Sequence, residues 1–151
     1  MKNIHIECFP DECLIRKIGF TRKYITHHQG KSRVFNVLSK SKNQLALVDE
    51  DPGSPKSSYE KSLKFKEESE GIKCYSDKSG NKVFYFNEKL EDWIINTCKK
   101  EKIELTHFGL PDTPDDLHDQ INQKLQNYER LLSELLKKKN SSIKKLKALL
   151  K

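Results

Sequence analysis

Apolar and polar positions follow two different spacings along the first fifty residues. Residues 3–9, 23–28 and 43–49 carry short apolar runs or alternation, which predicts three strands. Between them, residues 10–20 and 31–41 repeat their apolar positions every three to four residues, which predicts two helices. Strands that alternate with helices over short connections favour a parallel sheet with crossover helices.

The middle of the chain changes character after Pro52. Residues 52–71 are polar, and within them residues 59–70 fit an exposed helix with little to bury. Residues 72–86 predict a hairpin, or two short strands, around Ser79-Gly80-Asn81, and residues 87–103 predict a helix with one apolar face. We therefore expect an α/β domain over residues 1–106, built as a mainly parallel, Rossmann-like sheet flanked by helices.

The C-terminal third predicts a separate helical tail. A proline-containing linker over 107–114 precedes an amphipathic, lysine-rich tail over 115–151, which Asn140-Ser141-Ser142 interrupts. Five apolar residues of the tail repeat at spacings of four, three, four and three, which is a heptad seam: Ile121, Leu125, Tyr128, Leu132 and Leu135. About two heptads are short for an independent coiled coil. The seam is therefore predicted to dock on a partner protein or on a second copy of the chain.

The net charge of +7 belongs entirely to the end of this tail. Residues 137–151 hold seven lysines and no acid, whereas residues 1–136 hold 22 basic and 22 acidic residues. Attraction to nucleic acid is therefore expected from the tail, with these candidates: Lys137, Lys138, Lys139, Lys144 and Lys145. A solvated helix end is the simpler alternative for such a run.

The four cysteines form no CxxC pair, and no cluster of histidine and cysteine follows them. This spacing argues against a zinc site. The sequence also has no signal peptide and no long apolar span, so we expect a reduced, cytoplasmic protein that does not insert into a membrane.

Acidic residues follow two of the predicted strands. Glu7 closes the first, and Asp49 and Asp51 close the third, where residues i and i+2 of an extended chain point to the same side. Two carboxylates on one side repel each other unless a cation lies between them, and a hard divalent ion such as Mg²⁺ suits such ligands. Taken alone, the acids before Pro52-Gly53 fit an acidic turn better than a metal site, and Glu7 at the end of another strand is what raises the case for a site.

A second candidate site lies where the second strand meets the second helix. Gly30, Lys31 and Ser32 stand there, so Lys31, Ser32 and the free amides of the first helical turn are predicted to hold a phosphate. The segment is not a Walker A loop, because Ile25 stands where that motif requires glycine. A glycine-led turn with a solvated lysine is the alternative.

The order of these parts resembles the TOPRIM domain, which occurs in topoisomerases, bacterial primases and the overcoming-lysogenization-defect nucleases of phage defence. The resemblance rests on a strand ending in Glu7, then "CFPDECLIRKI", "HHQGKSRVFNVL" and "LALVDEDPG", and it covers about residues 2–100. The nuclease-like branch is the most similar. Two positions depart from the family pattern: Cys8 stands where glycine usually follows the glutamate, and Gly53 stands where topoisomerases often carry a third acid.

The resemblance implies a Mg²⁺- or Mn²⁺-dependent nuclease that cleaves phosphodiester bonds in DNA or RNA. Carried over by position, Glu7 becomes the general acid/base or a metal ligand, Asp49 and Asp51 become the metal-binding pair, and Glu91 becomes a weaker metal candidate. The resemblance also implies an effector subunit of a bacterial anti-phage complex beside a larger ATPase.

Two alternatives stay open from the sequence. The chain is either this nuclease or a non-catalytic TOPRIM-fold subunit that docks through its C-terminal helix and touches nucleic acid through its lysine tail. Simple basic binding of nucleic acid is a third possibility, and it predicts a steep salt dependence that is lost without residues 137–151.

Overall fold

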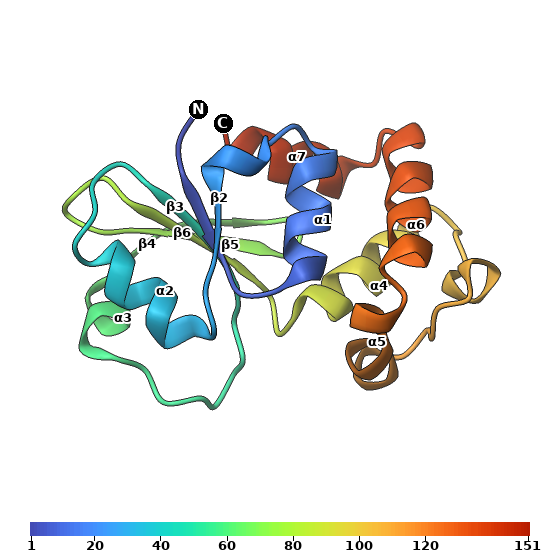
Figure 1. The fold of residues 1–151 in the computed structure, drawn as a ribbon, viewed down its shortest axis with the longest axis horizontal. Helices are drawn as coiled ribbons and strands as arrows, with labels where there is room; N and C mark the ends of the chain where they lie inside the picture. The colour runs from blue at the N-terminus through green and yellow to red at the C-terminus, as the bar shows by residue number, and fades with distance from the viewer.

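Six strands form one mixed sheet in the computed structural model, which describes all residues from 1 to 151 (Figure 1). The strands are β1 (Ile4–Ile6), β2 (Ile25–His27), β3 (Leu45–Asp49), β4 (Lys64–Ser69), β5 (Ile72–Ser76) and β6 (Lys82–Phe86). Their order is β2-β1-β3-β6-β5-β4. The pairs among β2, β1, β3 and β6 are parallel, and β5 and β4 add two antiparallel pairs. The predicted α/β class is confirmed, and the sheet is mostly parallel, with three parallel pairs among its five strand pairs.

Helices cover both faces of the sheet. They are α1 (Phe9–Lys17), α2 (Lys31–Leu38), α3 (Ser58–Ser62), α4 (Leu90–Lys100), α5 (Pro114–Gln120), α6 (Leu125–Lys137) and α7 (Ser141–Leu149), with short 3₁₀ turns η1 (Arg22–Tyr24), η2 (Leu105–Phe108) and η3 (Ile121–Gln123). Helices α2 and α3 lie on one face, and α1 and α4 to α7 lie on the other (Figure 1).

Strand β3 shows why the apolar runs are continuous rather than alternating. Leu45 and Leu47 join the core under α1 and α4, and Ala46 and Val48 join the core under α2. A central strand covered on both faces has no polar side to present to water, so every residue but the last is apolar. Asp49, at the end of the strand, is the first residue of β3 that is not fully buried between the two cores.

The predicted exposed helix at residues 59–70 is wrong for most of its length. Only a single turn, α3, is helical, and residues 64–69 form β4 at the edge of the sheet. Glu70 and Gly71 both have positive φ, at 53° and 77°, and this tight turn folds β4 back onto β5. The charged side chains of β4 are typical of an edge strand, and they concealed it in the sequence.

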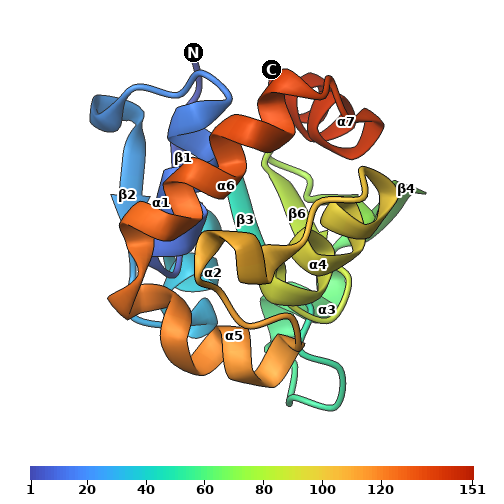
Figure 2. The ribbon, with the colours of Figure 1, turned by 90° about the vertical axis from the view of Figure 1, so that its right-hand side faces the viewer.

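The predicted partner seam is also wrong, because the chain itself covers it. Helix α6 crosses over α1 (Figure 2), and the seam lies in the same 28-residue core as β1 and α4. Tyr128 and Leu135 are fully buried there, and Leu125 packs against that core. The helix expected over residues 115–136 is broken into α5, η3 and α6 by a change of backbone direction at Lys124. The tail therefore completes the domain core rather than standing apart from it.

None of the helices combines the length and the apolar character needed to cross a membrane.

Candidate active site

Parallel pairing brings the ends of β1, β3 and β6 to one edge of the sheet. Ile4 lies opposite Leu45 in the β1–β3 pair, and Asp49 lies opposite Phe86 in the β3–β6 pair. Glu7 leaves β1 at this edge, where open α/β sheets commonly bind ligands. The structure thus places Glu7 and Asp49 at one edge, as the sequence predicted.

Asp49 makes a structural hydrogen bond and also belongs to the group of acids at this edge. Its Oδ1 accepts a hydrogen bond from the backbone N–H of Leu90 at 2.9 Å, which satisfies a free donor in the first turn of α4. Burial is the main reason that the pKa of Asp49 rises to about 7, against the effect of this hydrogen bond, and the charges of Glu91 and Asp51 raise it further. The carboxylate is therefore short of compensating positive charge.

Glu7 is in the same condition. Its Oε1 is buried without a hydrogen-bond partner. Burial, and then the charge of Asp49, raise the pKa of Glu7 to about 7, while the ammonium group of Lys31 opposes the shift. A carboxyl group that titrates near neutral pH is able to accept and to return a proton, which is the behaviour that general acid/base chemistry requires.

Asp51 does not pair with Asp49 through strand geometry. Strand β3 ends at Asp49, and Asp51 has a φ of 45°, so the expectation that the two side chains point to one side of an extended chain is wrong. The Asp51 carboxylate lies instead 3.7 Å from the ammonium group of Lys31. Its charge still contributes to the raised pKa of both Glu7 and Asp49. Glu50 turns away from Asp49 and forms an ion pair with Lys73.

Lys31 faces the acidic residues rather than open solvent. Its ammonium group donates a hydrogen bond to the backbone oxygen of Glu50 at 3.1 Å and lies beside Asp51. Ser32, the other predicted phosphate contact, is exposed. The predicted phosphate site and the predicted metal site therefore adjoin, and Lys31 belongs to both.

Asp11 is a further buried acid of this region that its position in the sequence does not reveal. Only 2% of this residue is exposed, its Oδ1 has no hydrogen-bond partner, and burial followed by the charge of Asp49 raises its pKa well above the ordinary value. Asp11 is an acid in the first turn of a helix, where the helix dipole alone explains an acid, so no feature of the sequence indicates that it is buried.

Glu91, the weaker metal candidate, is also buried, with 4% of its surface exposed. Its Oε1 lies 2.6 Å from Nδ1 of His118 on α5, and its Oε2 has no partner. The hydroxyl group of Tyr128, fully buried on α6, also lacks a partner, and burial and then the charge of Asp11 raise the pKa of Tyr128. Side chains of α5 and α6 therefore cover this acidic region on the face of the sheet where α1 lies.

The acidic side chains suit a divalent cation in chemistry but not in their present arrangement. Carboxylate oxygens are the ligands that Mg²⁺ prefers, and Glu7, Asp11 and Glu91 each keep a buried oxygen without a partner. However, the structure brings no three Asp, Glu, His or Cys side chains around a common point suited to a metal ion. Binding a cation at this edge would require these side chains to change rotamer.

None of the tail lysines forms an ion pair with Glu7, Asp11, Asp49 or Asp51. Helix α7 lies instead against the turn between β4 and β5, where the hydroxyl group of Ser142 donates to the Glu70 carboxylate at 3.0 Å. Lys137, Lys138, Lys139 and Lys144 are exposed, and the ammonium group of Lys145 lies 3.5 Å from Glu67 of β4. The acidic residues and the tail lysines therefore form two separate surfaces.

No protein-family model, no curated protein and no solved structure matches this chain. The candidate function accordingly rests on the residues of the chain itself.

Proposed function

We propose that this chain is a TOPRIM-like, Mg²⁺- or Mn²⁺-dependent nuclease that cleaves phosphodiester bonds in DNA or RNA. The observation that carries the proposal is the set of buried carboxylates at the carboxyl edge of the sheet. Glu7 and Asp11 keep unpartnered oxygens, and Lys31 is the cation that opposes the raised pKa of Glu7 and Asp49. A cluster of carboxylates is costly to bury without a counter-ion, and a divalent cation would supply the missing positive charge.

In this proposal Glu7, Asp49 and Asp51 would hold the metal ion, with Asp11 and Glu91 as further carboxylates within the same region. A bound divalent ion stabilises the negative charge that develops on the phosphate oxygens during cleavage. Glu7 accepts or returns a proton. Lys31, beside Asp51 and the Glu50 carbonyl, is placed to attract the phosphate group.

Residues 49–51 supply two test variants and one matched control. Asp49→Asn and Asp51→Asn each remove one proposed ligand, whereas Glu50→Gln removes an equal charge from a side chain that pairs with Lys73. We expect Mg²⁺- or Mn²⁺-dependent nicking of plasmid to fall by about 100-fold or more in the two aspartate variants, because charge stabilisation of this kind is a large share of catalysis. Glu50→Gln should keep its activity. Full nicking activity of Asp49→Asn would contradict the assignment of Asp49 as a metal ligand.

The resemblance extends the proposal to an effector subunit that works beside an ATPase in a cytoplasmic anti-phage complex. The buried heptad seam is not available for this assembly, so the contact would use other surfaces. Purifying the protein from its own cell tests the idea, because a stable ATPase should accompany it. Purification of the chain alone at native expression would contradict it.

A non-catalytic TOPRIM-fold subunit is the second candidate, and one observation favours it. The hydrogen bond from Leu90 gives Asp49 a structural role that needs no metal. Calorimetric titration with Mg²⁺ and Mn²⁺ separates the two candidates. The absence of binding, together with cells in which Asp49→Asn behaves like the parent, would establish the non-catalytic role. The exposed tail lysines would then remain for nucleic acid, and replacing them should reduce the salt dependence of binding.

A further inference from the structure

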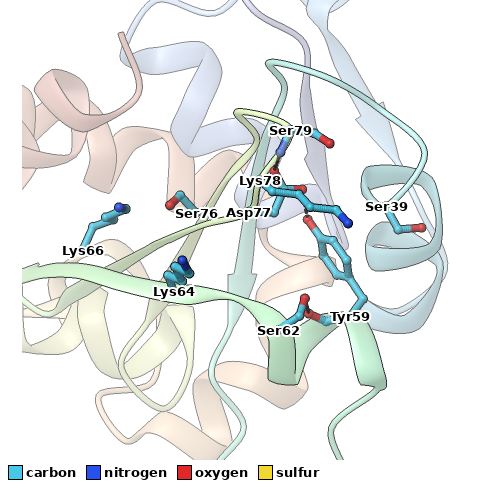
Figure 3. A pocket seen from close by; sticks show the side chains of 9 residues that line it. All are labelled: Ser39, Tyr59, Ser62, Lys64, Lys66, Ser76, Asp77, Lys78 and Ser79. Carbon is cyan, nitrogen blue, oxygen red and sulfur yellow. Dashed lines mark hydrogen bonds between the residues drawn. The ribbon is translucent and has the colours of Figure 1, made fainter.

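A polar cavity lies near the amino end of β6, whereas the acidic residues lie at the carboxyl ends of the parallel strands. The start of β4, the turn between β5 and β6, and the ends of α2 and α3 form it (Figure 3). The turn lies next to the start of β3, because Asn43 N–H donates to the oxygen of Ser79 at 3.2 Å and Lys82 N–H donates to the oxygen of Gln44 at 3.0 Å. The cavity has a volume of about 510 Å³.

Three lysines line this cavity without a carboxylate partner. Lys64 and Lys66 come from β4 and Lys78 comes from the turn, and none of the three lies within 4.0 Å of an acid. By contrast, Lys73 of β5 pairs with Glu50, and Glu67 of β4 pairs with Lys145. The three ammonium groups therefore leave the cavity with unbalanced positive charge.

The single acid in the lining, Asp77, offsets at most one of these three positive charges and forms no ion pair with the lysines. Its carboxylate accepts hydrogen bonds from Tyr59 Oη at 2.7 Å, from the backbone N–H of Ser79 at 2.8 Å and from both nitrogens of Asn81. Burial alone would raise the pKa of Asp77, but the hydrogen bonds from Asn81 and Tyr59 outweigh it and hold the pKa below its usual range. Asp77 thus stays charged and is used to fix the turn.

Two hydroxyl groups of the lining are free to bind a ligand. Ser39 and Ser62 already donate to backbone oxygens, at 2.8 and 2.6 Å. The hydroxyl groups of Ser76 and Ser79 have no partner within the chain and stand beside the lysines (Figure 3). A ligand in this cavity would meet three ammonium groups and two hydroxyl donors.

The lining also excludes ligands with a large apolar body. Tyr59 is its one hydrophobic residue. The ring of Tyr59 packs against Phe35 at 5.7 Å between centroids, and its hydroxyl group is bound to Asp77, so the ring is not free to stack on a base. The volume falls within the range of small-ligand sites, about 300–1,000 Å³.

We propose that this cavity binds phosphate groups that carry two or more negative charges, from a free phosphate ester or from the backbone of a nucleic acid. Lysine and hydroxyl donors without apolar neighbours match this chemistry. The proposal does not depend on the acidic residues at the other edge, and neither Lys31 nor any lysine of the tail lines the cavity.

Calorimetric titration of the full chain tests the proposal with two probes, inorganic pyrophosphate and a short single-stranded DNA oligonucleotide. The test variant replaces Lys64, Lys66 and Lys78 by Gln. The matched control replaces Lys137, Lys138 and Lys139 by Gln, which removes the same charge from exposed residues elsewhere. Asp49→Asn is titrated in parallel and should bind pyrophosphate like the parent, which separates this proposal from the nuclease proposal.

At about 20 mM salt, where screening is weak, we expect the test variant to bind pyrophosphate about tenfold more weakly or worse, and the control to match the parent. That result assigns the cavity to free phosphate esters. If pyrophosphate does not bind, but the oligonucleotide loses more affinity with the test variant than with the control, the ligand is the nucleic-acid backbone. Equal effects of the two variants on both probes, or no binding of either probe to the parent, would overturn the proposal. Ser76→Ala with Ser79→Ala gives a second variant with no change of charge, and it should weaken the same probe.

Discussion

The carboxylate of Asp49 accepts the backbone N–H of Leu90 at 2.9 Å, so the last residue of β3 caps the first turn of α4. Lys89, the residue that precedes this helix, provides no side-chain cap of its own. The second oxygen of Asp49 has no hydrogen bond within the chain and shares the acidic edge with Glu7. One side chain thus connects the stability of α4 to the chemistry of the candidate site.

This relationship predicts different costs for two substitutions of Asp49. Asparagine keeps an oxygen that can accept the Leu90 N–H, whereas alanine does not, and both remove the charge. We expect Asp49→Ala to have a free energy of unfolding lower than that of Asp49→Asn by about 1 kcal/mol, the usual value of a helix cap. Urea denaturation of the two variants at one pH measures the difference. Equal stabilities would mean that the hydrogen bond contributes nothing.

The raised pKa values of Glu7 and Asp49 predict that the protein loses stability as the pH rises. Their ordinary pKa values of 4.5 and 3.8 rise to about 7 in the fold, so between about pH 4 and 7 the folded state holds protons that the unfolded chain has released. The free energy of unfolding therefore falls through this window, by at most about 3 kcal/mol for Glu7 and about 4 kcal/mol for Asp49. Denaturation curves in EDTA between pH 5 and 8 should show a shallower decline for Glu7→Gln than for the parent.

Two comparisons isolate the contribution of Glu7. Burial and the charge of His5 lower the pKa of His28, which makes stability change in the opposite direction, but this contribution is common to the parent and to the variant. Glu50 has a lowered pKa despite its partial burial, because of its hydrogen bond with Lys73, so Glu50→Gln should keep the slope of the parent above pH 5. Parallel curves for the parent and for Glu7→Gln would contradict the prediction.

Local spacing predicted the elements that meet at the candidate site, but not the contacts among them. The runs that became β1, α1, β2, α2 and β3 each carry a clear apolar period, and the ends of these strands placed Glu7 and Asp49 at one edge. The burial of Asp11 depends on α6 packing over α1, more than 110 residues later in the chain. No local pattern records such a contact, so the residue appeared to be an ordinary helix-terminal acid.

The wrong predictions for the heptad seam and for β4 have a common physical cause. A heptad seam states that a helix face is apolar, but not which surface covers it, and here α1 and the sheet do so. The charged segment of β4 has no apolar alternation because it is the edge strand, held by its backbone pairing with β5. In both cases the structure of the segment depends on the element that packs against it or pairs with it.

The burial of the seam predicts that α6 is essential to the stability of the domain. Leu132 is 1% exposed within the core that includes α1 and β1. We expect Leu132→Ala to lower the free energy of unfolding by about 2–5 kcal/mol, the usual cost of a buried leucine. Gln126→Ala, on the exposed side of the same helix, should change it by less than about 0.5 kcal/mol. Urea denaturation that finds equal stabilities would show that α6 is not part of the core.

The turn between β4 and β5 yields a prediction that the single tryptophan can report. Gly71 has a φ of 77°, and a Cβ atom there would lie 2.9 Å from Cδ1 of Trp93, whose Nε1 donates a hydrogen bond to the oxygen of Glu70 at 2.9 Å. Gly71→Ala therefore combines backbone strain with displacement of a buried ring. Gly19→Ala is the matched control, because Gly19 has a φ of 120° and no atom within 4 Å of the added Cβ. We expect Gly71→Ala to be less stable than Gly19→Ala by about 1 kcal/mol or more, the order of cost of overpacking a core. The fluorescence of Trp93 should shift only in Gly71→Ala, and identical spectra and stabilities for the two variants would exclude a close contact between the turn and the indole ring.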